Sequence, residues 1–223
     1  MKNNGIIYLI AIVIIVSTWL MAGAAIVLGW PILKIFGMVF IICKGIELIA
    51  TMVGLSVDFR LAMALCKGRY VYDETGRMHH YQSLLRHVWE MPQMFVGYML
   101  GMCRIIMGKV RKVETVWGVT FVVCEHAQNS CVGVSLGPIV NIASNKPHEE
   151  SIRVLIQQDM GIYKHELGHT VDSLIWGWLY LLVIGLPSMV SVQMETMRIG
   201  HHKHCRLYAE RWANRHGAWV MKQ

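Results

Sequence analysis

The sequence is short of charged residues and of proline. Asp, Glu, Lys and Arg supply 16% of the 223 residues, whereas they make up roughly 25% of an ordinary soluble domain. Apolar residues reach 55%, and this shift in composition indicates contact with lipid. None of the five prolines falls between Pro147 and Pro187, so nothing in that stretch forbids a helix.

Two motifs are also missing. No pair among the six cysteines has the CxxC spacing, so we expect no cysteine metal site. The net charge is +7, but the Lys and Arg residues are scattered and no RNA- or DNA-binding motif accompanies them. We therefore expect no nucleic-acid partner, and we interpret the positive charge as attraction of a membrane-facing surface to anionic lipid.

Long uncharged stretches take the place of the missing charges. Residues 5–31 carry no charge, and about 20 apolar residues are enough to cross a bilayer. This predicts a first transmembrane span over residues 6–28, as an uncleaved anchor. A cleaved signal is the alternative, because residues 22–25 form a cluster of small side chains. A second span is predicted over residues 35–57.

Two apolar segments are less regular than the first span. The second span contains Lys44 and Glu47 near its middle, and their spacing lets them neutralise each other on one helix face. The alternatives are a buried polar element near a catalytic site, or the functional residues of an assembly or channel component. The third segment, residues 174–194, is charge-free but interrupted by glycine, proline and serine. It is expected as a kinked span, a re-entrant hairpin or a buried core element.

Basic residues give the expected orientation. Lys2 precedes the first span and only Lys34 lies between the spans, whereas nine Lys and Arg residues fall between residues 60 and 112. The positive-inside rule places both ends of this hairpin in the cytoplasm, where free thiols are the rule. We predict a mainly α membrane protein, with residues 1–60 as a transmembrane hairpin and residues 61–223 as a cytoplasmic α+β region.

A mixed helical and β region is predicted after the spans. Residues 87–108 are apolar and rich in methionine, which predicts a helix lying on the membrane or packed on the spans. Residues 113–124 and 132–142 predict the two strands of a β-hairpin, the second interrupted by a bulge or edge at Gly137-Pro138. An extended substrate can pair with the free edge of such a strand. Residues 144–150 supply capping and first-turn residues for the next helix.

That helix carries the motif His165-Glu166-Leu167-Gly168-His169, either without a break or after an irregularity at Met160-Gly161. Residues four apart share a helix face, so His165 and His169 can bind one metal ion. Glu166 points to the adjoining face, where it can take a proton from a water activated by the metal. Asp172 falls on the same side as the histidines and can orient one of them; the alternative is a helix-end carboxylate that faces water or Lys164.

A catalytic zinc usually takes three protein ligands and keeps one open position, so a third ligand is expected downstream. Glu210 is preferred, because Ala213 would let its helix approach the motif and Asn214 could hydrogen-bond the outer nitrogen of a ligand histidine. Glu195 is one alternative. The other is a cluster of three histidines, which can also be a solvated basic turn: His201, His202 and His204.

HELGH followed by a helix with the ExxA pattern resembles the gluzincin zinc metallopeptidases. Among them the chain is most similar to membrane-integrated families of the heat-shock-protease and CaaX-protease kind, whose pattern is HExxH followed by ExxAD. The resemblance implies Zn²⁺ bound by His165, His169 and Glu210, with Glu166 as the catalytic base. Asn214 stands where the pattern has Asp. It can accept a hydrogen bond from imidazole but lacks the charge that raises ligand basicity.

The last quarter of the chain also resembles an uncharacterised bacterial membrane-protein group. That group has HExGHxxQS, GxxYLxxIGxPS and WxExxANxxG elements, which correspond here to residues 165–173, 177–188 and 208–217, with Asp172 in place of Gln. The resemblance implies a bacterial inner-membrane protein with its HELGH region on the cytoplasmic side. It implies no established substrate.

These observations predict a membrane-bound zinc endopeptidase with a zincin-like region that hydrolyses a peptide or protein substrate. Candidate donors to the tetrahedral intermediate are Tyr208, His216 and His204. One alternative is a non-catalytic membrane protein with a structural zinc, closed by a histidine of residues 201–204 as fourth ligand. Another is an intramembrane protease with the motif inside the bilayer.

Overall fold

The computed structural model describes residues 31–72, 76–125, 132–144, 151–157, 161–197 and 204–220, together with Trp19 and Gly23. The rest of the predicted first span, His201 and His202 therefore lie outside the described residues. The chain divides into two compact units, Met1–Ile49 and Ala50–Gln223. The described cysteines are all free thiols: Cys43, Cys66, Cys103, Cys124 and Cys205.

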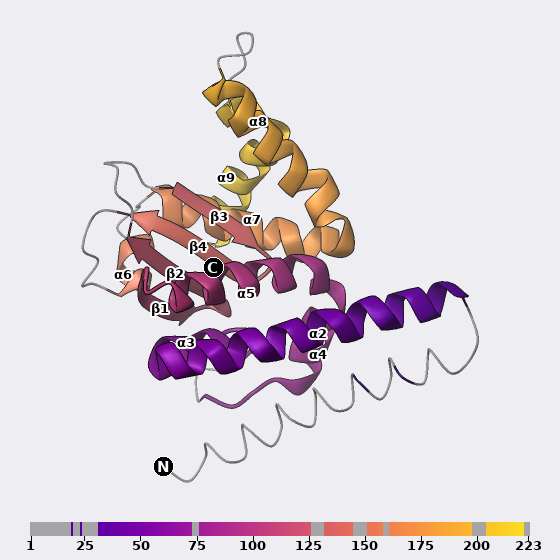
Figure 1. Cartoon of the computed structure of the whole chain (residues 1–223). Helices are drawn as coiled ribbons and strands as arrows, with labels where there is room; N and C mark the ends of the chain where they lie inside the picture. The colour runs from indigo at the N-terminus through magenta and orange to yellow at the C-terminus, as the bar shows by residue number, and fades with distance from the viewer. Residues whose placement is uncertain are drawn as a thin grey trace. The chain divides into compact units, whose positions relative to one another are not determined.

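The described chain is mostly helical and contains one small sheet (Figure 1). Its helices and strands are α2 Pro31–Val57, α3 Phe59–Lys67, α4 His80–Trp89, α5 Met91–Ile106, β1 Val110–Val116, β2 Val119–Glu125, β3 Val132–Leu136, β4 Ile139–Ser144, α6 Ile152–Gln157, α7 Gly161–Trp176, α8 Leu186–Thr196 and α9 Tyr208–Val220. Three short helical turns, marked η, complete the set: η1 Gly177–Leu179, η2 Leu181–Gly185 and η3 His204–Arg206.

Helix α2 is the long apolar element near the N-terminus. Its segment Lys34–Val57 has a mean hydropathy of 2.0 and is long enough to cross a membrane. Pro31 suits the first turn, because its fixed φ is already helical and that position needs no N–H. Lys44 Nζ lies 2.9 Å from Glu47 Oε2, so the predicted pairing of these two charges is confirmed.

The sheet has the strand order β1-β2-β4-β3 and lies in the second unit. Strands β1 and β2 are antiparallel, β2 and β4 are parallel, and β3 and β4 are antiparallel. The prediction of a single two-stranded hairpin was wrong, because each predicted strand is itself a hairpin. Trp117 and Gly118 form a two-residue turn with φ of 49° and 73°, a geometry that suits the strand twist. Gly137, with φ of 64°, and Pro138 make the second turn.

Helices cover both faces of the sheet (Figure 1). Successive side chains of a strand point to opposite faces, so Val122 and Phe121 enter different cores. The core with α3 and α5 contains Leu65, Met94, Tyr98, Met102, Ile105, Val122 and Ile139. The core with α6 and α7 contains Phe121, Val123, Val140, Ile142, Ile156, Tyr163 and Leu167. The sheet is therefore a buried platform that presents its edge strand β3 to helix α7.

One helical prediction needs correction. The single helix predicted over residues 87–108 is two helices, α4 and α5, and Glu90 lies between them. Helix α5 buries one face on the sheet, and Gly97 lets it approach β3 closely, since a Cβ there would lie 2.6 Å from the Leu136 carbonyl oxygen. The motif helix α7 begins at Gly161 and is separate from α6.

The third apolar segment is broken rather than straight. Helix α7 ends at Trp176, Gly177 follows with φ of 50°, and α8 leaves at an angle of 117°. Most of its large apolar side chains are exposed, whereas Tyr180 and Ile184 are buried in a small core with Ala209. The bent pair of helices passes the length and hydropathy test for a broken span or a re-entrant loop.

Candidate metal centre

Helices α7 and α9 pack closely enough for their backbones to touch. A Cβ added at Gly168 would lie 1.8 Å from the carbonyl oxygen of Ala213, and one at Gly217 would lie 2.2 Å from that of Lys164. Two glycines, one on each helix, therefore permit the contact. Ala213 was predicted to allow this approach, and the smaller Gly168 faces it. The contact holds the HELGH turn of α7 against the first turns of α9.

The three predicted ligands come together at this contact. His165 Nε2 lies 3.0 Å and His169 Nε2 3.6 Å from Glu210 Oε2. The ligand atoms of the three residues all lie within 4.8 Å of one another. Glu210 is buried, and its Oε1 atom makes no hydrogen bond of normal geometry within the described structure. The group could hold a metal ion, and its two imidazoles and one carboxylate are a donor set that zinc accepts.

Both histidines direct Nε2 at Glu210 and Nδ1 away from it. His165 Nδ1 lies 3.0 Å from Asn214 Oδ1, and His169 Nδ1 lies 3.3 Å from Asp172 Oδ2. The first contact is a hydrogen bond, whereas the second is an ion pair whose two atoms make no hydrogen bond of normal geometry. A proton on Nδ1 facing these oxygens leaves Nε2 free for a metal. Asp172 is fully buried, and its Oδ1 lies 2.6 Å from His216 Nδ1. The alternative of a water-facing Asp172 was therefore wrong.

Glu166 is buried between α7 and the edge strand β3. Its Oε2 accepts a hydrogen bond of 2.6 Å from Ser135 Oγ. Gly133 leaves room for the carboxylate, because a Cβ there would lie 2.4 Å from Glu166 Oε1. Tyr180 donates to the carbonyl oxygen of Ser135 at 2.8 Å and so fixes this part of β3. Sequence reasoning missed these three neighbours, since no local spacing relates β3 to the motif.

Burial and hydrogen bonding set the charges of the centre. Burial raises the pKa of Glu166, and the nearby His169 and Ser135 offset only part of this effect. Burial alone would lower the pKa of His169, but contact with the Asp172 and Glu210 carboxylates raises it to about 9. For Glu210 the two effects have the opposite signs. Burial raises its pKa, but hydrogen bonds to both imidazoles hold the pKa well below the usual range. The metal-free centre is thus a cluster of ion pairs in which a metal would displace protons.

His204 lies at the edge of the centre, outside the group of three. Its Nε2 is 3.3 Å from Glu210 Oε2 and its Nδ1 is 3.1 Å from Ser191 Oγ. The backbone N–H of His204 donates to Glu195 Oε2 at 2.8 Å. Glu195, an alternative third ligand, instead fixes the position of His204 and is not part of the group that could hold a metal.

The other predicted donors to a tetrahedral intermediate are engaged elsewhere. The hydroxyl of Tyr208 donates to the carbonyl oxygen of Val183, and His216 is held by Asp172. Of the three candidates, His204 therefore has its ring closest to the metal ligands. Its Nε2 approaches the same Glu210 oxygen as the two ligand histidines.

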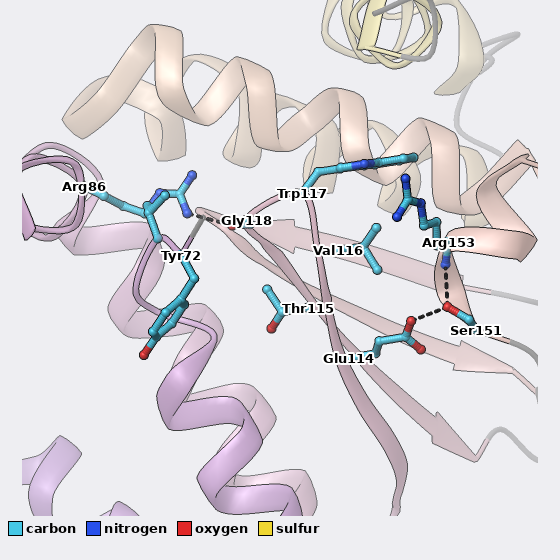
Figure 2. A pocket seen from close by; sticks show the side chains of 10 residues that line it. Tyr72, Arg86, Glu114, Thr115, Val116, Trp117, Gly118, Ser151 and Arg153 are labelled. Atoms are coloured by element: carbon cyan, nitrogen blue, oxygen red, sulfur yellow. Dashed lines mark hydrogen bonds between the residues drawn. The ribbon is translucent and has the colours of Figure 1, made fainter. Parts of the chain in front are cut away.

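A cavity of about 540 Å³ lies at the β1–β2 turn. Figure 2 shows Arg86 on one side of it and Arg153 on the other. Its polar groups largely satisfy one another. Arg86 donates to the carbonyl oxygen of Gly118 at 2.7 Å, and Glu114 accepts the first backbone N–H of α6 at 3.0 Å. The guanidinium of Arg153 lies over the Trp117 ring. The ten residues that line the cavity include none of the candidate metal ligands.

No protein-family model, no curated protein and no solved structure matches this chain. The resemblance to gluzincins therefore depends on the motif residues alone. The geometry adds to the motif. The ligand atoms of His165, His169 and Glu210 lie close together, although Glu210 is on another helix and follows His165 by 45 residues.

Proposed function

We propose that this chain is a membrane-bound zinc metallopeptidase that hydrolyses peptide bonds. The observation that supports it best is the placement of the buried carboxylate of Glu166 beside the group formed by His165, His169 and Glu210. A metal site without a neighbouring base would serve binding alone. When bound, zinc polarises a scissile carbonyl and brings the pKa of a water molecule toward neutrality.

Glu166 has the properties of a general base in this proposal. Its raised pKa brings it closer to the operating pH, at which proton transfer in both directions is efficient. Glu166 takes the proton of the attacking water and returns it to the leaving amine. Ser135 holds one carboxylate oxygen, so the other, Oε1, faces the space that Gly133 leaves open.

Strand β3 supplies a surface for the substrate. It lies at the edge of the sheet and pairs only with β4 among the described strands. An extended peptide can add to such an edge through main-chain hydrogen bonds, and at Gly133 it would then lie near Glu166 Oε1. His204 is the candidate donor to the oxygen that gains negative charge, since an imidazole N–H can serve this purpose.

A metal analysis of the purified full chain tests the proposal. Wild type and Glu166→Gln are expected to carry about one zinc per chain, because the base is not a ligand. Glu210→Ala should lose most of the metal. Glu125→Ala is the control, since it removes an exposed carboxylate that pairs with Arg111 and lies outside the ligand group. Zinc-free wild type would overturn the metalloprotein reading, and full occupancy in Glu210→Ala would remove that residue from the site.

Activity separates the base from the ligands. Glu166→Gln keeps the shape of the side chain and should lose peptide hydrolysis by at least about a hundredfold, the contribution typical of a general base. Zinc content must stay unchanged for this result to count. Hydrolysis by Glu166→Gln at the wild-type rate would show that Glu166 is not the base.

A structural zinc site is the second candidate, and the position of His204 favours it. A structural zinc usually has four protein ligands, and His204 Nε2 already lies 3.3 Å from Glu210 Oε2. In that case His204→Ala should lower both the zinc content and the melting temperature. A catalytic site instead predicts that His204→Ala keeps its zinc and loses only turnover. The visible spectrum of the cobalt-substituted protein reports the number of ligands in each variant.

The proposal includes a membrane location. The length and hydropathy of Lys34–Val57 support it, as does the net charge of +7. The basic residues that follow α2 favour a cytoplasmic position for the HELGH region, in a bacterial inner membrane by resemblance. In intact spheroplasts, the HELGH region should be protected from a protease added outside. Cleavage of this region only after lysis would agree with the proposed orientation.

A further inference from the structure

Helix α4 is inverted relative to a helix of a soluble protein. It buries Ser83 and His87, while its large apolar side chains point outward. The exposed ones are Tyr81, Leu84, Leu85, Val88 and Trp89. A helix normally turns its apolar stripe toward the core and its polar residues toward water. The inverted pattern indicates that the surroundings of α4 are apolar.

The broken segment after α7 shows the same inversion. The last turns of α7, just before this segment, bury Thr170, Asp172 and Ser173. Helix α8 buries only Ser191. The apolar side chains of residues 174–192 are mostly exposed: Leu174, Ile175, Trp178, Leu179, Leu182, Leu186, Met189, Val190 and Val192. Two separate parts of the chain therefore turn polar groups inward and apolar groups outward.

These two parts form one surface, which we call the apolar face. The Trp89 indole N–H donates to the carbonyl oxygen of Leu174 at 2.8 Å. The Trp178 indole N–H donates to that of Val88 at 2.6 Å. A mostly apolar hollow of about 460 Å³ lies along the seam and is lined by residues of both parts. Contiguous exposed apolar patches of this kind mark binding or membrane surfaces in proteins.

The apolar face carries no free charge. Residues 174–194 contain no Asp, Glu, Lys or Arg. Arg86 and Glu90, the ionisable pair at the end of α4, face inward and lie 3.2 Å apart. Glu90 also accepts a hydrogen bond of 2.5 Å from Ser173. Charges in contact with hydrocarbon are expensive unless they are paired in this way.

Backbone groups at the helix break are satisfied by side chains rather than left to water. The last carbonyls of a helix have no partner within it. Here Trp89 binds the carbonyl of Leu174, and Gln93 Nε2 binds that of Gly177 at 2.9 Å. Trp178 binds the carbonyl of Val88, near the end of α4. Internal satisfaction of this kind is what a helix break in contact with a bilayer requires, because hydrocarbon offers no hydrogen bonds.

We propose that the apolar face contacts the hydrocarbon of a lipid bilayer, as a second membrane attachment in addition to α2. The inference rests on the membrane location in the proposed function and is independent of zinc. It deepens that function, because Leu174 follows His169 by five residues, or about 7.5 Å along a helix. The metal centre is then at the bilayer surface, and its substrate is a peptide segment next to the membrane.

Photolabelling of the intact wild-type chain tests the apolar face. The purified protein is reconstituted in phosphatidylcholine vesicles that contain a phosphatidylcholine with a diazirine on its acyl chain. After irradiation, mass spectrometry assigns the adducts to residues. Adducts on α4 and residues 174–192 are expected at a yield comparable to that on α2. They should exceed several-fold the yield on two exposed apolar residues outside the face, Trp117 and Val132.

Trp117 is a matched control for Trp89, because the two side chains are 46% and 48% exposed. Adducts on α2 but none above the control level on the apolar face would overturn the inference while the membrane location stands. Absence of adducts on α2 as well would contradict the membrane location itself. Disulfide cross-links between copies in Leu85→Cys or Leu182→Cys, with no lipid adducts on the apolar face, would overturn the inference and identify a second copy of the chain as the occupant.

Discussion

His165 and His169 lie one turn apart on α7, with ring centroids 4.8 Å apart, yet their outer nitrogens meet different groups. The His165 side chain is 22% exposed and faces the neutral amide of Asn214. The His169 side chain is 8% exposed and faces the buried carboxylate of Asp172. A carboxylate raises the basicity of a ligand imidazole more than an amide does. The buried side of the centre therefore has the stronger outer partner.

This difference bears on the departure of the sequence from the gluzincin pattern. The chain has Asn214 where that pattern has Asp, but it also has Asp172 where the bacterial membrane group has Gln. The negative charge is thus present on the other histidine. We interpret Asp172 as a positioning residue that makes up for the missing charge at residue 214.

The largest loss of zinc and of stability is expected from a substitution that disturbs the surroundings of His165 and of His169 together. Gly168→Ala would place a Cβ 1.8 Å from the Ala213 carbonyl oxygen and push α9, with Glu210 and Asn214, away from α7. A loss of about 3 kcal/mol in unfolding free energy is expected from such overpacking, together with loss of zinc. Thermal unfolding and metal content measure the two effects.

Gly161→Ala on the same helix is the control for that substitution, because no heavy atom lies within 4 Å of its added Cβ. It should keep its zinc and change stability by no more than about 1 kcal/mol. If both variants behave alike, the close contact of α7 with α9 is not what holds the centre together.

Asp172→Asn should give the next largest effect. It keeps the size of the side chain but removes the charge beside His169. Zinc affinity, measured by competition with a chelator, should fall about 10- to 100-fold. Asn214→Ala on the His165 side should cost less, about tenfold or below. Equal losses would mean that the two sides contribute alike, and a larger loss for Asn214→Ala would reverse the comparison.

Asn214→Asp should give the smallest effect and one of opposite sign. It restores the charge of the gluzincin pattern next to His165 and should raise zinc affinity, by less than about tenfold. Arg215→Gln is the matched control, since it changes the net charge by the same one unit on the adjacent residue without touching a ligand. An unchanged affinity in Asn214→Asp would show that Asp172 already supplies all the charge the site can use.

The parts of the site that depend on helical spacing were predictable from the sequence. His165 and His169 are four residues apart, as are Glu210 and Asn214, so each pair shares a face once its segment is helical. The partners of Glu166 were not predictable. Gly133 and Ser135 reach it because β3 lies along α7, and this depends on packing between distant segments.

The fold shows the same limit. The apolar run of residues 35–57 identified α2 as a long helix directly, although Lys44 and Glu47 interrupt it. The turn at Trp117-Gly118 escaped notice, because a tryptophan with positive φ is rare. The parallel pairing of β2 with β4 depends on long-range contacts. For α4, periodicity indicates which residues lie on the same side of the helix. Only the structure shows that its apolar side chains point away from the core.

The separation of the ligands in sequence has a consequence for biosynthesis. Glu210 follows His165 by 45 residues, and a ribosome adds roughly 5–20 residues per second, so the third ligand emerges seconds after the motif. Helix α2 and the sheet precede both. The nascent chain thus begins to fold while the group of His165, His169 and Glu210 is incomplete. The proposed hydrolytic activity can therefore arise only after synthesis has passed α9.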